Sequence, residues 1–391
     1  MTARDNPKIL FLTRSLDTGG AERQIVELAS GLHSIGWDVK VATFYGGGAL
    51  ESRLRETGLD TICLDKQGRW DVVRFSWRLL RLLRKQRPDI AHGYLECANM
   101  PLTFLRPLLR NMRVVWGVRR SGMDVVENDW FSRVEIRLSV WLSRFADLII
   151  CNSRAGHTYH AQQGYPGERM VVIPNGIDLD QFRADAEARA KLRAGWGVAD
   201  GQQLVGLVGR LHPMKDHPNF LRAAAQVSAS HADVRFICVG DGPASYREEL
   251  ARIALELGLA DRIIWSPARA DVARVYNALD IAVSASSCGE GFSNTIAEAM
   301  ATGVPVVATD VGDSAALVAE LGWICAPSDS AALGAAISAA LSALPIDAAA
   351  LRRRIASSYG SAELLRGTVE HLSRLIEPLS ATAEAHVELG R

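Results

Sequence analysis

Short apolar segments alternate along this chain with amphipathic segments, and this alternation constrains the fold more than any other feature. The first apolar segment, Lys8–Leu12, is followed by a Gly19–Gly20 turn and by apolar residues at helical spacing from Ile25 to Leu32. The pattern continues through strands expected at 39–44, 88–92, 114–117, 147–151 and 170–174 and helices expected at 72–85 and 134–145. Strands that are joined through helices form parallel sheets covered on both faces. The first half of the chain is therefore predicted to be a doubly wound α/β domain.

A second series of apolar segments begins after a polar stretch, rich in Ala and Arg, at residues 181–201. Its strands are expected at 204–208, 234–239, 263–265, 281–284 and 304–308. We therefore place one domain at 1–178 and a second, again doubly wound, at 179–360, and we expect 361–391 to form a helix that packs back towards the first domain and then a polar tail. Ligands of such sheets bind beyond the carboxyl ends of the strands, so two facing domains would enclose a cleft.

The composition excludes several classes of protein. Lys and Arg together number 44, as do Asp and Glu, which argues against a dedicated nucleic-acid-binding protein. The six cysteines lie far apart without a Cys-x-x-Cys pair, which favours buried reduced thiols over disulfides or a zinc site. The N-terminal segment has no signal-peptide core, and the Ala-rich segment 331–344 favours a packed helix over a membrane span because serines interrupt it. We therefore expect a cytoplasmic protein.

The segment 284–307 carries the densest cluster of residues suited to ligand binding. It predicts a strand, a glycine-containing loop, a helix that begins near Ser293–Thr295, and another strand. The free N–H groups at the start of such a helix, with the positive end of its dipole, form an anion site that suits a phosphate. Glu298 is either the capping-box partner of Thr295 or an acceptor for sugar hydroxyls, and Glu290 is either a solvated loop charge or another such acceptor.

Two cations, Arg210 and Lys215, follow the first strand of the second domain and are expected on a loop at the cleft. The guanidinium is a planar fork for two oxygens and the ammonium is a mobile charge, so the pair suits a diphosphate, although an ordinary basic surface loop is the alternative. Gly19–Gly20 either brings bare backbone close to an anion from the opposite wall or forms a plain tight turn. Gly240-Asp-Gly242 lacks the third glycine of a dinucleotide fingerprint, which argues against a nicotinamide dehydrogenase.

Five motifs occur in the order seen in glycosyltransferase family 4, and the chain resembles that family from residue 8 to residue 375. The motifs are Gly19-Gly-Ala-Glu22, Ile173-Pro-Asn-Gly-Ile-Asp178, Val208-Gly-Arg210 with Lys215, Val239-Gly-Asp-Gly-Pro243 and Glu290-Gly-Phe-Ser-Asn-Thr-Ile-Ala-Glu298. The resemblance implies a GT-B fold of two facing Rossmann-like domains. It also implies a hexosyltransferase that moves a sugar, with retention, from a UDP- or GDP-linked donor to a glycan or lipid-linked acceptor, with no metal or other cofactor.

The family motifs also imply roles for individual residues. Glu298 would bind the donor ribose, Glu290 would lie beside the donor sugar, and Arg210 and Lys215 would hold the diphosphate. Arg210, Lys215 and Glu290 are therefore the expected catalytic residues, with front-face attack by the acceptor because no residue stands out as a covalent nucleophile. The complete expected donor site consists of Gly19, Gly20, Arg210, Lys215, Glu290, Gly291, Phe292, Ser293, Asn294, Thr295 and Glu298.

The acceptor side is less well marked in the sequence. Many family members carry His after the strand that here ends at Trp116, whereas this chain continues Gly-Val-Arg119, as in the branch that builds bacterial surface polysaccharides. Arg119 is the candidate for that position, and Ser121 follows it. His92 and Glu96 are expected to follow a strand end and to contact the sugar or the acceptor.

Two further features allow alternative interpretations. Residues 69–120 hold 12 Lys and Arg against 3 Asp and Glu, and the 72–85 helix and the segment around Arg106, Arg110 and Arg113 combine cations with large apolar residues. Two interpretations are open. The segments either rest on an anionic membrane, which would place the protein on the inner face of the cytoplasmic membrane, or form core helices whose outer faces are solvated. Asp178-Leu-Asp180 matches an Asp-x-Asp metal site only superficially, because it lies in a linker turn.

Two other functions compete with sugar transfer. A sugar-nucleotide 2-epimerase of the same two-domain build would need acid and base residues around the sugar and no acceptor. A non-catalytic sugar-nucleotide-binding protein would need only the cleft. Analysis of the products separates these possibilities from a transferase.

Overall fold

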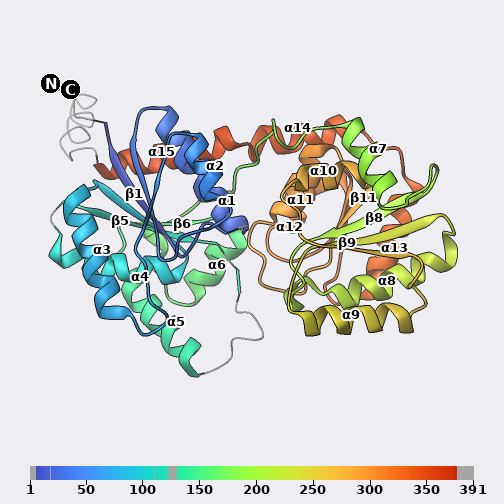
Figure 1. Ribbon diagram of the computed structural model, residues 1–391, viewed down its shortest axis with the longest axis horizontal. Coiled ribbons are helices and arrows are strands. Elements are labelled where there is room, and N and C mark those ends of the chain that lie inside the picture. Colours follow the sequence, from blue (N-terminus) through green and yellow to red (C-terminus); the bar gives the residue numbers. More distant parts are fainter. Residues whose placement is uncertain (1–5, 18, 110, 120, 123–129, 377–391) are drawn as a thin grey trace, which may run out of the picture.

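The computed structural model describes residues 6–17, 19–109, 111–119, 121–122 and 130–376, and these form two α/β lobes that lie side by side (Figure 1). Arg110 of the basic region and the expected tail at 377–391 lie outside the described residues. Each lobe is a parallel sheet with helices on both faces, which confirms the predicted fold class.

The first lobe has a seven-stranded parallel sheet in the order β3-β2-β1-β4-β5-β6-β7. The strands are β1 (Lys8–Thr13), β2 (Asp38–Thr43), β3 (Thr61–Cys63), β4 (Ile90–Tyr94), β5 (Arg113–Val118), β6 (Leu148–Cys151) and β7 (Met170–Val172). The helices are α1 (Gly20–Ser34), α2 (Glu51–Glu56), α3 (Val72–Gln86), α4 (Glu96–Leu105), α5 (Trp130–Ser143) and α6 (Arg154–Gln162). The strand order reverses between β1 and β4, so the crevice of this sheet opens beyond the carboxyl ends of those two strands.

The second lobe has a six-stranded parallel sheet in the order β10-β9-β8-β11-β12-β13. The strands are β8 (Gln203–Val208), β9 (Val234–Val239), β10 (Ile263–Ser266), β11 (Ile281–Ser284), β12 (Val306–Thr309) and β13 (Trp323–Cys325). The helices are α7 (Ala186–Gly195), α8 (His217–Ser230), α9 (Ala244–Glu256), α10 (Val272–Ala278), α11 (Asn294–Thr302), α12 (Ser314–Val318), α13 (Ser330–Ser342) and α14 (Ala348–Ser358). Its reversal point lies between β8 and β11, which places the loops after these strands at the crevice.

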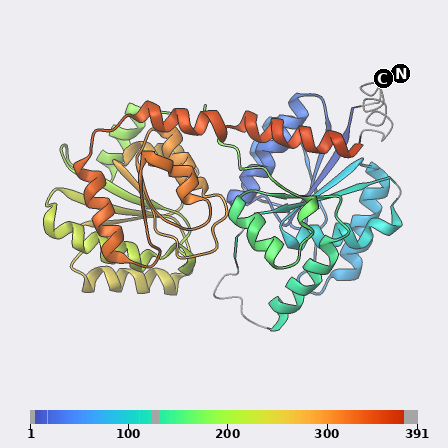
Figure 2. The same ribbon diagram turned by 180° about the vertical axis from the view of Figure 1, so that it is seen from behind.

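The chain crosses between the lobes twice, and the two crossings are hydrogen-bonded to each other. The N–H of Ile177 donates to the carbonyl of Tyr359 (2.8 Å), and the N–H of Ser361 donates to the carbonyl of Ile177 (3.1 Å). After the second crossing, α15 (Ser361–Ile376) runs along the first lobe, as the two opposite views show (Figures 1 and 2). Leu364 and Leu372 of α15 are buried in the core of that lobe. The last described helix therefore ties the end of the chain to the lobe in which the chain begins.

Two local expectations need correction or addition, and a third is confirmed. The stretch 181–201 contains α7, whose Asp185 side chain caps its N-terminus by accepting from the N–H of Ala188 (2.8 Å). The six cysteines are free thiols, but Cys63 is exposed, contrary to the expected burial. The Ala-rich segment forms α13, with Leu333, Ile337 and Leu341 buried, as predicted. Within the described ranges, every helix is too short or too polar to cross a bilayer.

Candidate functional site

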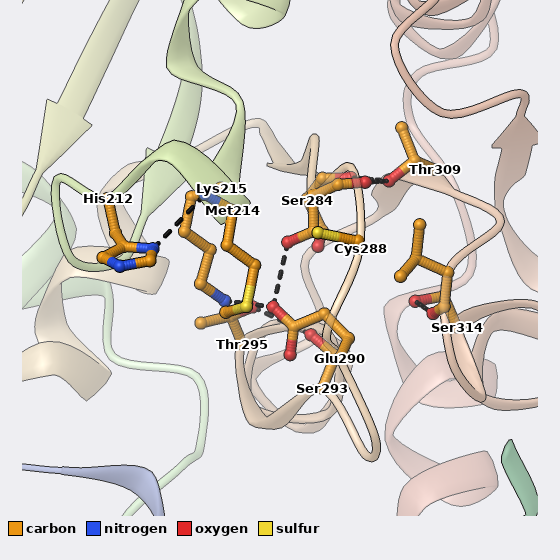
Figure 3. Close-up of polar contacts among 12 residues, drawn as sticks. His212, Met214, Lys215, Ser284, Cys288, Glu290, Ser293, Thr295, Thr309 and Ser314 are labelled. Atoms are coloured by element: carbon orange, nitrogen blue, oxygen red, sulfur yellow. Dashed lines mark hydrogen bonds and ion pairs between the residues drawn. The ribbon is translucent and has the colours of Figure 1, made fainter. Parts of the chain in front are cut away.

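Two loops of the second lobe meet at its crevice and are joined by hydrogen bonds. The loop after β8 carries Arg210 and a short 3₁₀ turn, Pro213–Lys215, whose start is capped by His212 Nδ1, which accepts from the N–H of Met214 (3.3 Å). The N–H of Ser287, in the loop after β11, donates to the carbonyl of Met214 (2.9 Å). The two loops therefore hold each other in place, and Lys215 projects from one of them towards the other (Figure 3).

Lys215 and Glu290 form a hydrogen-bonded ion pair at the centre of this site. Their side chains are only 16% and 11% exposed, and they point towards each other (Figure 3). The hydroxyl of Ser286 also donates to Glu290 Oε1 (2.9 Å). Burial by itself would raise the pKa of the Glu290 carboxyl, but the charge and hydrogen bond of Lys215, the Ser286 hydroxyl and the charge of Arg210 bring that pKa below its usual value. Glu290 is therefore held as a carboxylate.

Glu298 is buried in α11 and is bound from both lobes. Arg23, in the first turn of α1 of the first lobe, lies 2.8 Å from Glu298 Oε1, and the Tyr276 hydroxyl donates to Oε2 (3.0 Å). Burial raises the pKa of Glu298 more than the charge of Arg23 and the hydroxyl of Tyr276 lower it. The capping-box alternative for Glu298 is wrong, because its carboxylate pairs with Arg23 and Tyr276.

The N-terminus of α11 faces the first lobe. The Ser293 side chain makes no capping bond to the helix and instead shares a hydrogen bond with the Thr295 hydroxyl (3.1 Å). A side chain added at Gly20, the first residue of α1, would come within 2.8 Å of Asn294 Nδ2. At Gly19 an added Cβ would lie 1.8 Å from a carboxylate oxygen of Glu22. Gly20 thus permits the close approach of α1 to the tip of α11, whereas Gly19 leaves room for the Glu22 side chain of α1 itself.

Arg119 and Ser121 of the first lobe also reach this region. The Arg119 guanidinium lies 4.4 Å from the centroid of the Tyr94 ring and donates to Asn175 Oδ1 (2.8 Å). Asn175 in turn donates from Nδ2 to Asn294 Oδ1 (2.8 Å), which links the first lobe to the tip of α11. Ser121 donates from its hydroxyl to the backbone carbonyl of Glu290. Both residues after β5 therefore contact the expected donor loop directly or through one side chain.

Two expected contact residues lie elsewhere. His92 was expected at a strand end, but it lies in the middle of β4, fully buried beside Phe11 and Tyr94, and burial together with the charge of Arg119 puts its pKa well below the usual value. Phe292 belongs to the core of the second lobe, where its ring packs edge-on against Tyr359 (5.4 Å between centroids). Both side chains are therefore buried in the described structure.

The remaining candidates are placed as follows. Glu96 is the first residue of α4 and is mostly buried. Gly291 packs against the first lobe, since an added Cβ would lie 2.7 Å from Asn152 Oδ1. Asp178 Oδ1 accepts the N–H groups of Asp180 (3.0 Å) and Gln181 (2.9 Å), so this carboxylate shapes the linker turn.

Sequence reasoning missed three members of the site. Arg23 directly follows the Gly-Gly-Ala-Glu motif, so its position in the first turn of a helix at the cleft was available as a signal. Tyr276 and Ser286 give no comparable signal. Each donates its hydroxyl to a glutamate of its own lobe, and the tertiary packing that brings them together has no sequence motif.

Comparison with protein families gives two matches. Residues 18–181 match the family described as "Glycosyltransferase Family 4", and residues 202–343 match "Glycosyl transferases group 1". The chain is 35% identical over 181 residues to a D-inositol 3-phosphate glycosyltransferase of Segniliparus rotundus; the alignment covers 45% of this chain and 39% of that protein. The protein of the same name from Mycolicibacterium smegmatis is 37% identical over 158 residues, covering 39% of this chain and 35% of its own length. The chain thus aligns with less than half of each of these relatives.

Solved structures resemble the whole chain. HepE of Anabaena in complex with UDP-glucose is 27% identical, has a TM-score of 0.83 and covers 94% of this chain and 99% of its own. Sucrose-phosphate synthase of Thermosynechococcus elongatus is 20% identical with a TM-score of 0.83, covering 95% of this chain and 99% of its own, which shows the likeness of fold. The two-lobed architecture is therefore that of the GT-B glycosyltransferases.

Lys215→Ala should destabilise the protein by about 3 kcal/mol at pH 8, because it leaves the buried Glu290 carboxylate without its cationic partner. Without Lys215, burial raises the pKa of Glu290 above the value of about 4.3 that Glu has in an unfolded chain, so the penalty is complete above the raised pKa, shrinks as the pH falls through it and disappears near the unfolded value. The measurement is urea unfolding at pH 8 and pH 5. Lys191→Ala, at an exposed position of α7, is the matched control; equal loss in both variants contradicts the pairing.

Proposed function

Since the chain belongs to glycosyltransferase family 4, we propose that it transfers a sugar from a UDP-linked donor to a glycan or lipid-linked acceptor, with retention at the anomeric carbon and without a metal or other cofactor. The supporting observation is the convergence of Lys215, Arg210, the tip of α11 and Glu298 on one crevice. UDP is favoured over GDP because HepE, at 26–27% identity, forms complexes with UDP and with UDP-glucose. A role in building a cell-surface polysaccharide or glycolipid follows from the sequence after β5, which resembles that branch of the family.

The cleft would act mainly on the leaving group. Cleavage of the bond between the anomeric carbon and the phosphate leaves negative charge on the diphosphate, and Arg210, Lys215 and the N–H groups of Ser293 to Thr295 supply positive charge and donors for it. These interactions strengthen as the charge develops, so they lower the barrier more than they stabilise the bound donor. Glu298, with Arg23 beside it, would accept hydrogen bonds from the ribose hydroxyls.

Glu290 would bind the donor sugar rather than attack it. Its carboxylate already accepts from Lys215 and Ser286, which lowers its basicity and disfavours a covalent intermediate. The acceptor hydroxyl would then attack the same face that the diphosphate leaves. Its proton would pass to the departing phosphate oxygen, so that the proton and the sugar exchange between the two oxygens.

Incubation with UDP-glucose, UDP-galactose and UDP-N-acetylglucosamine, with GDP-sugars in parallel, tests the function. We expect release of UDP together with transfer to a glycan or lipid acceptor, retention of the α-anomer by NMR, and the same rate in EDTA. A 2-epimer as the product would identify an epimerase. Binding of the nucleotide sugar without any turnover over the full acceptor panel would identify a binding protein.

Arg210→Ala should lower kcat by about 10- to 100-fold, since one charge-assisted hydrogen bond to the leaving group contributes about 1.5–3 kcal/mol. Arg210 is exposed, so the substitution should leave the melting temperature nearly unchanged. Steady-state kinetics with saturating acceptor measure the effect. The control is Arg222→Ala, in α8 of the same lobe; a kcat for Arg210→Ala within twofold of the unaltered enzyme contradicts the assignment.

The outer surface of the first lobe supports a membrane as the second partner. Large apolar side chains are exposed on helices α3, α4 and α5 or within two residues of their ends; they are Val134, Leu138, Trp141, Phe145, Trp70, Val73, Trp77 and Phe104. Val134, Leu138 and Trp141 recur at intervals of four and three residues, which aligns them on one face of α5, and Phe145 follows two residues beyond the end of the helix. Exposed cations, Arg74, Arg81, Arg84 and Lys85, accompany them on α3. Apolar and basic groups on one surface suit an anionic bilayer.

The structure also refines the two alternatives for the basic region. Phe75, Leu79, Leu82 and Leu83 of the 72–85 helix are core residues, whereas its Val72, Val73 and Trp77 are exposed. Arg106 and Arg113 both pair with Asp147 (2.8 and 3.2 Å), so they add little free charge.

An open groove of about 1140 Å³ lies next to the exposed side chains of α4 and α5, lined in part by Phe104, Trp141 and Phe145. Asp89 and Arg113, at the starts of β4 and β5, also line it, so it opens at the end of the sheet opposite the donor cleft. The proposed membrane surface and the donor site are therefore separate.

The double variant Trp77→Ala/Trp141→Ala should reduce binding to phosphatidylglycerol vesicles at least about a hundredfold, because each large apolar side chain that enters the bilayer contributes about 1.5–3 kcal/mol and about 1.4 kcal/mol corresponds to a factor of ten. Binding of the unaltered protein should weaken as salt rises, since ions screen the cations of α3. Co-sedimentation across a salt series measures both effects. Leu255→Ala, at a 67% exposed position on α9 of the second lobe, is the control; equal binding by all three proteins contradicts a membrane surface here.

A further inference from the structure

An aspartate of the second lobe caps a helix of the first lobe. Asp313 lies in the loop between β12 and α12, and its carboxylate accepts from the N–H of Arg154 (Oδ2, 2.8 Å) and from the N–H of Ala155 (Oδ1, 2.9 Å). These are the first two residues of α6. The cap within the first lobe, Ser153 Oγ, accepts only from Gly156 (2.9 Å) in the described structure. The second lobe therefore supplies acceptors that the first turn of α6 needs.

The same loop fixes the backbone at Glu290. The N–H of Asp313 donates to the carbonyl of Gly291 (3.0 Å). The preceding Gly312 has φ +64°, and a side chain there would come within 2.4 Å of the Glu290 carbonyl and 2.5 Å of the Gly291 carbonyl. Asp313 thus bonds through its N–H to the loop that carries Glu290 and through its carboxylate to the opposite lobe.

The first lobe packs against the other side of the loop that carries Glu290 and Gly291. An added Cβ on Gly291 would lie 2.7 Å from Asn152 Oδ1 and 2.9 Å from Ser153 Oγ, at the start of α6. Ser121 donates to the carbonyl of Glu290. The backbone of Glu290 and Gly291 is therefore enclosed between the Gly312–Asp313 turn and the first lobe.

From this arrangement we propose that Asp313 is a positioning residue that couples the approach of the two lobes to the placement of the Glu290 carboxylate. The proposal rests on the proposed function and assigns a part in it to a residue outside the donor cleft. When the lobes separate, the carboxylate loses both N–H donors and the Glu290–Gly291 loop loses its support from the first lobe. Approach of the lobes restores both together, because a carboxylate at a helix N-terminus gains two hydrogen bonds and the favourable field of the helix.

Asp313 differs in one respect from the other contacts between the lobes. Arg23–Glu298 and Asn175–Asn294 involve side chains of the expected donor site, so a bound donor changes their surroundings directly. Within the described residues, the Asp313 carboxylate is hydrogen-bonded to backbone N–H groups at the start of α6 and not to a side chain of the donor site. Its contribution therefore depends on the position of the lobes and not on which sugar is bound.

The test compares Asp313→Ala and Asp313→Asn with the unaltered enzyme in steady-state kinetics and in UDP titration. We expect Asp313→Ala to lower kcat at least tenfold while the Kd of UDP changes less than threefold, because UDP binds mainly to the second lobe. Asp313→Asn keeps a neutral acceptor and should recover part of the rate. Small-angle scattering should show compaction on adding UDP in the unaltered protein and less compaction in Asp313→Ala.

A second pair of variants tests the helix side of the cap. Arg154→Pro removes the N–H that bonds Asp313 Oδ2, and proline is tolerated in the first turn of a helix. Ser153 has an extended backbone (φ −155°, ψ 154°), which is the conformation required before proline. Arg154→Ala keeps the N–H and is the matched control. Arg154→Pro should lower kcat whereas Arg154→Ala should not, and Asp313→Ala/Arg154→Pro should be no slower than Asp313→Ala alone.

Asp310→Ala, in the same loop and exposed, is the control for the loop and should retain full kcat. The proposal is overturned if Asp313→Ala has a kcat within twofold of the unaltered enzyme, or if its effect adds fully to that of Arg154→Pro. These results differ from failure of the proposed function, in which the unaltered protein itself transfers no sugar. In that case equal compaction of the unaltered protein and Asp313→Ala in the scattering experiment still overturns the coupling.

Discussion

The loop from Glu290 to Ser293 has to fit both lobes at once, and the rest of the site depends on this double contact. Gly291 packs so closely on Asn152 and Ser153 that a side chain there would overlap them, while Gly312 presses on the same backbone from the other side. This packing fixes where Glu290 meets Lys215 and where α11 begins. A site built this way is complete only while the lobes are together, because the first lobe packs against one side of this loop.

The pKa values of the two buried glutamates, Glu290 and Glu298, depend on their neighbouring side chains as well as on burial. Both are almost fully buried, and burial acts on both in the same direction. For Glu290 the ammonium group of Lys215 and the Ser286 hydroxyl outweigh burial, and its pKa falls; for Glu298 burial outweighs the arginine from the other lobe and the tyrosine hydroxyl, and its pKa rises. The cation for Glu290 comes from the same lobe, whereas the cation for Glu298 arrives only with the opposite lobe. Separation of the lobes would therefore leave Glu298 without its cationic partner but Glu290 with its own.

The sequence predicts much of this architecture because its determinants are local. Apolar runs mark the central strands, and the helix start at Ser293–Thr295 and the glycines at 19–20 follow from nearby residues. The edge strands β3 and β13 were not predicted, because a strand of three residues is too short to show an alternation of apolar and polar side chains. His92 was predicted at the end of a strand, but β4 extends two residues further, to Tyr94. His92 therefore lies in the buried middle of the strand. Arg23 and Asp313 act across the lobe boundary, where no local pattern records the partner.

In helix α5 the spacing of the apolar residues predicts the wrong face as the buried one. The spacing of Val134, Leu138 and Trp141, continued by Phe145 beyond the helix end, would ordinarily mark a core-facing stripe, yet these side chains are exposed. The face turned inward carries Ser139, Leu142 and Ser143, because Ser139 shares a hydrogen bond with the buried Tyr165 hydroxyl (2.7 Å) and Ser143 donates to the carbonyl of Val140 (2.7 Å). A helix that satisfies its polar face inside and leaves its larger apolar face in water loses burial energy in the isolated molecule. An apolar partner on that face would offset the loss, and the neighbouring cations of α3 favour an anionic one.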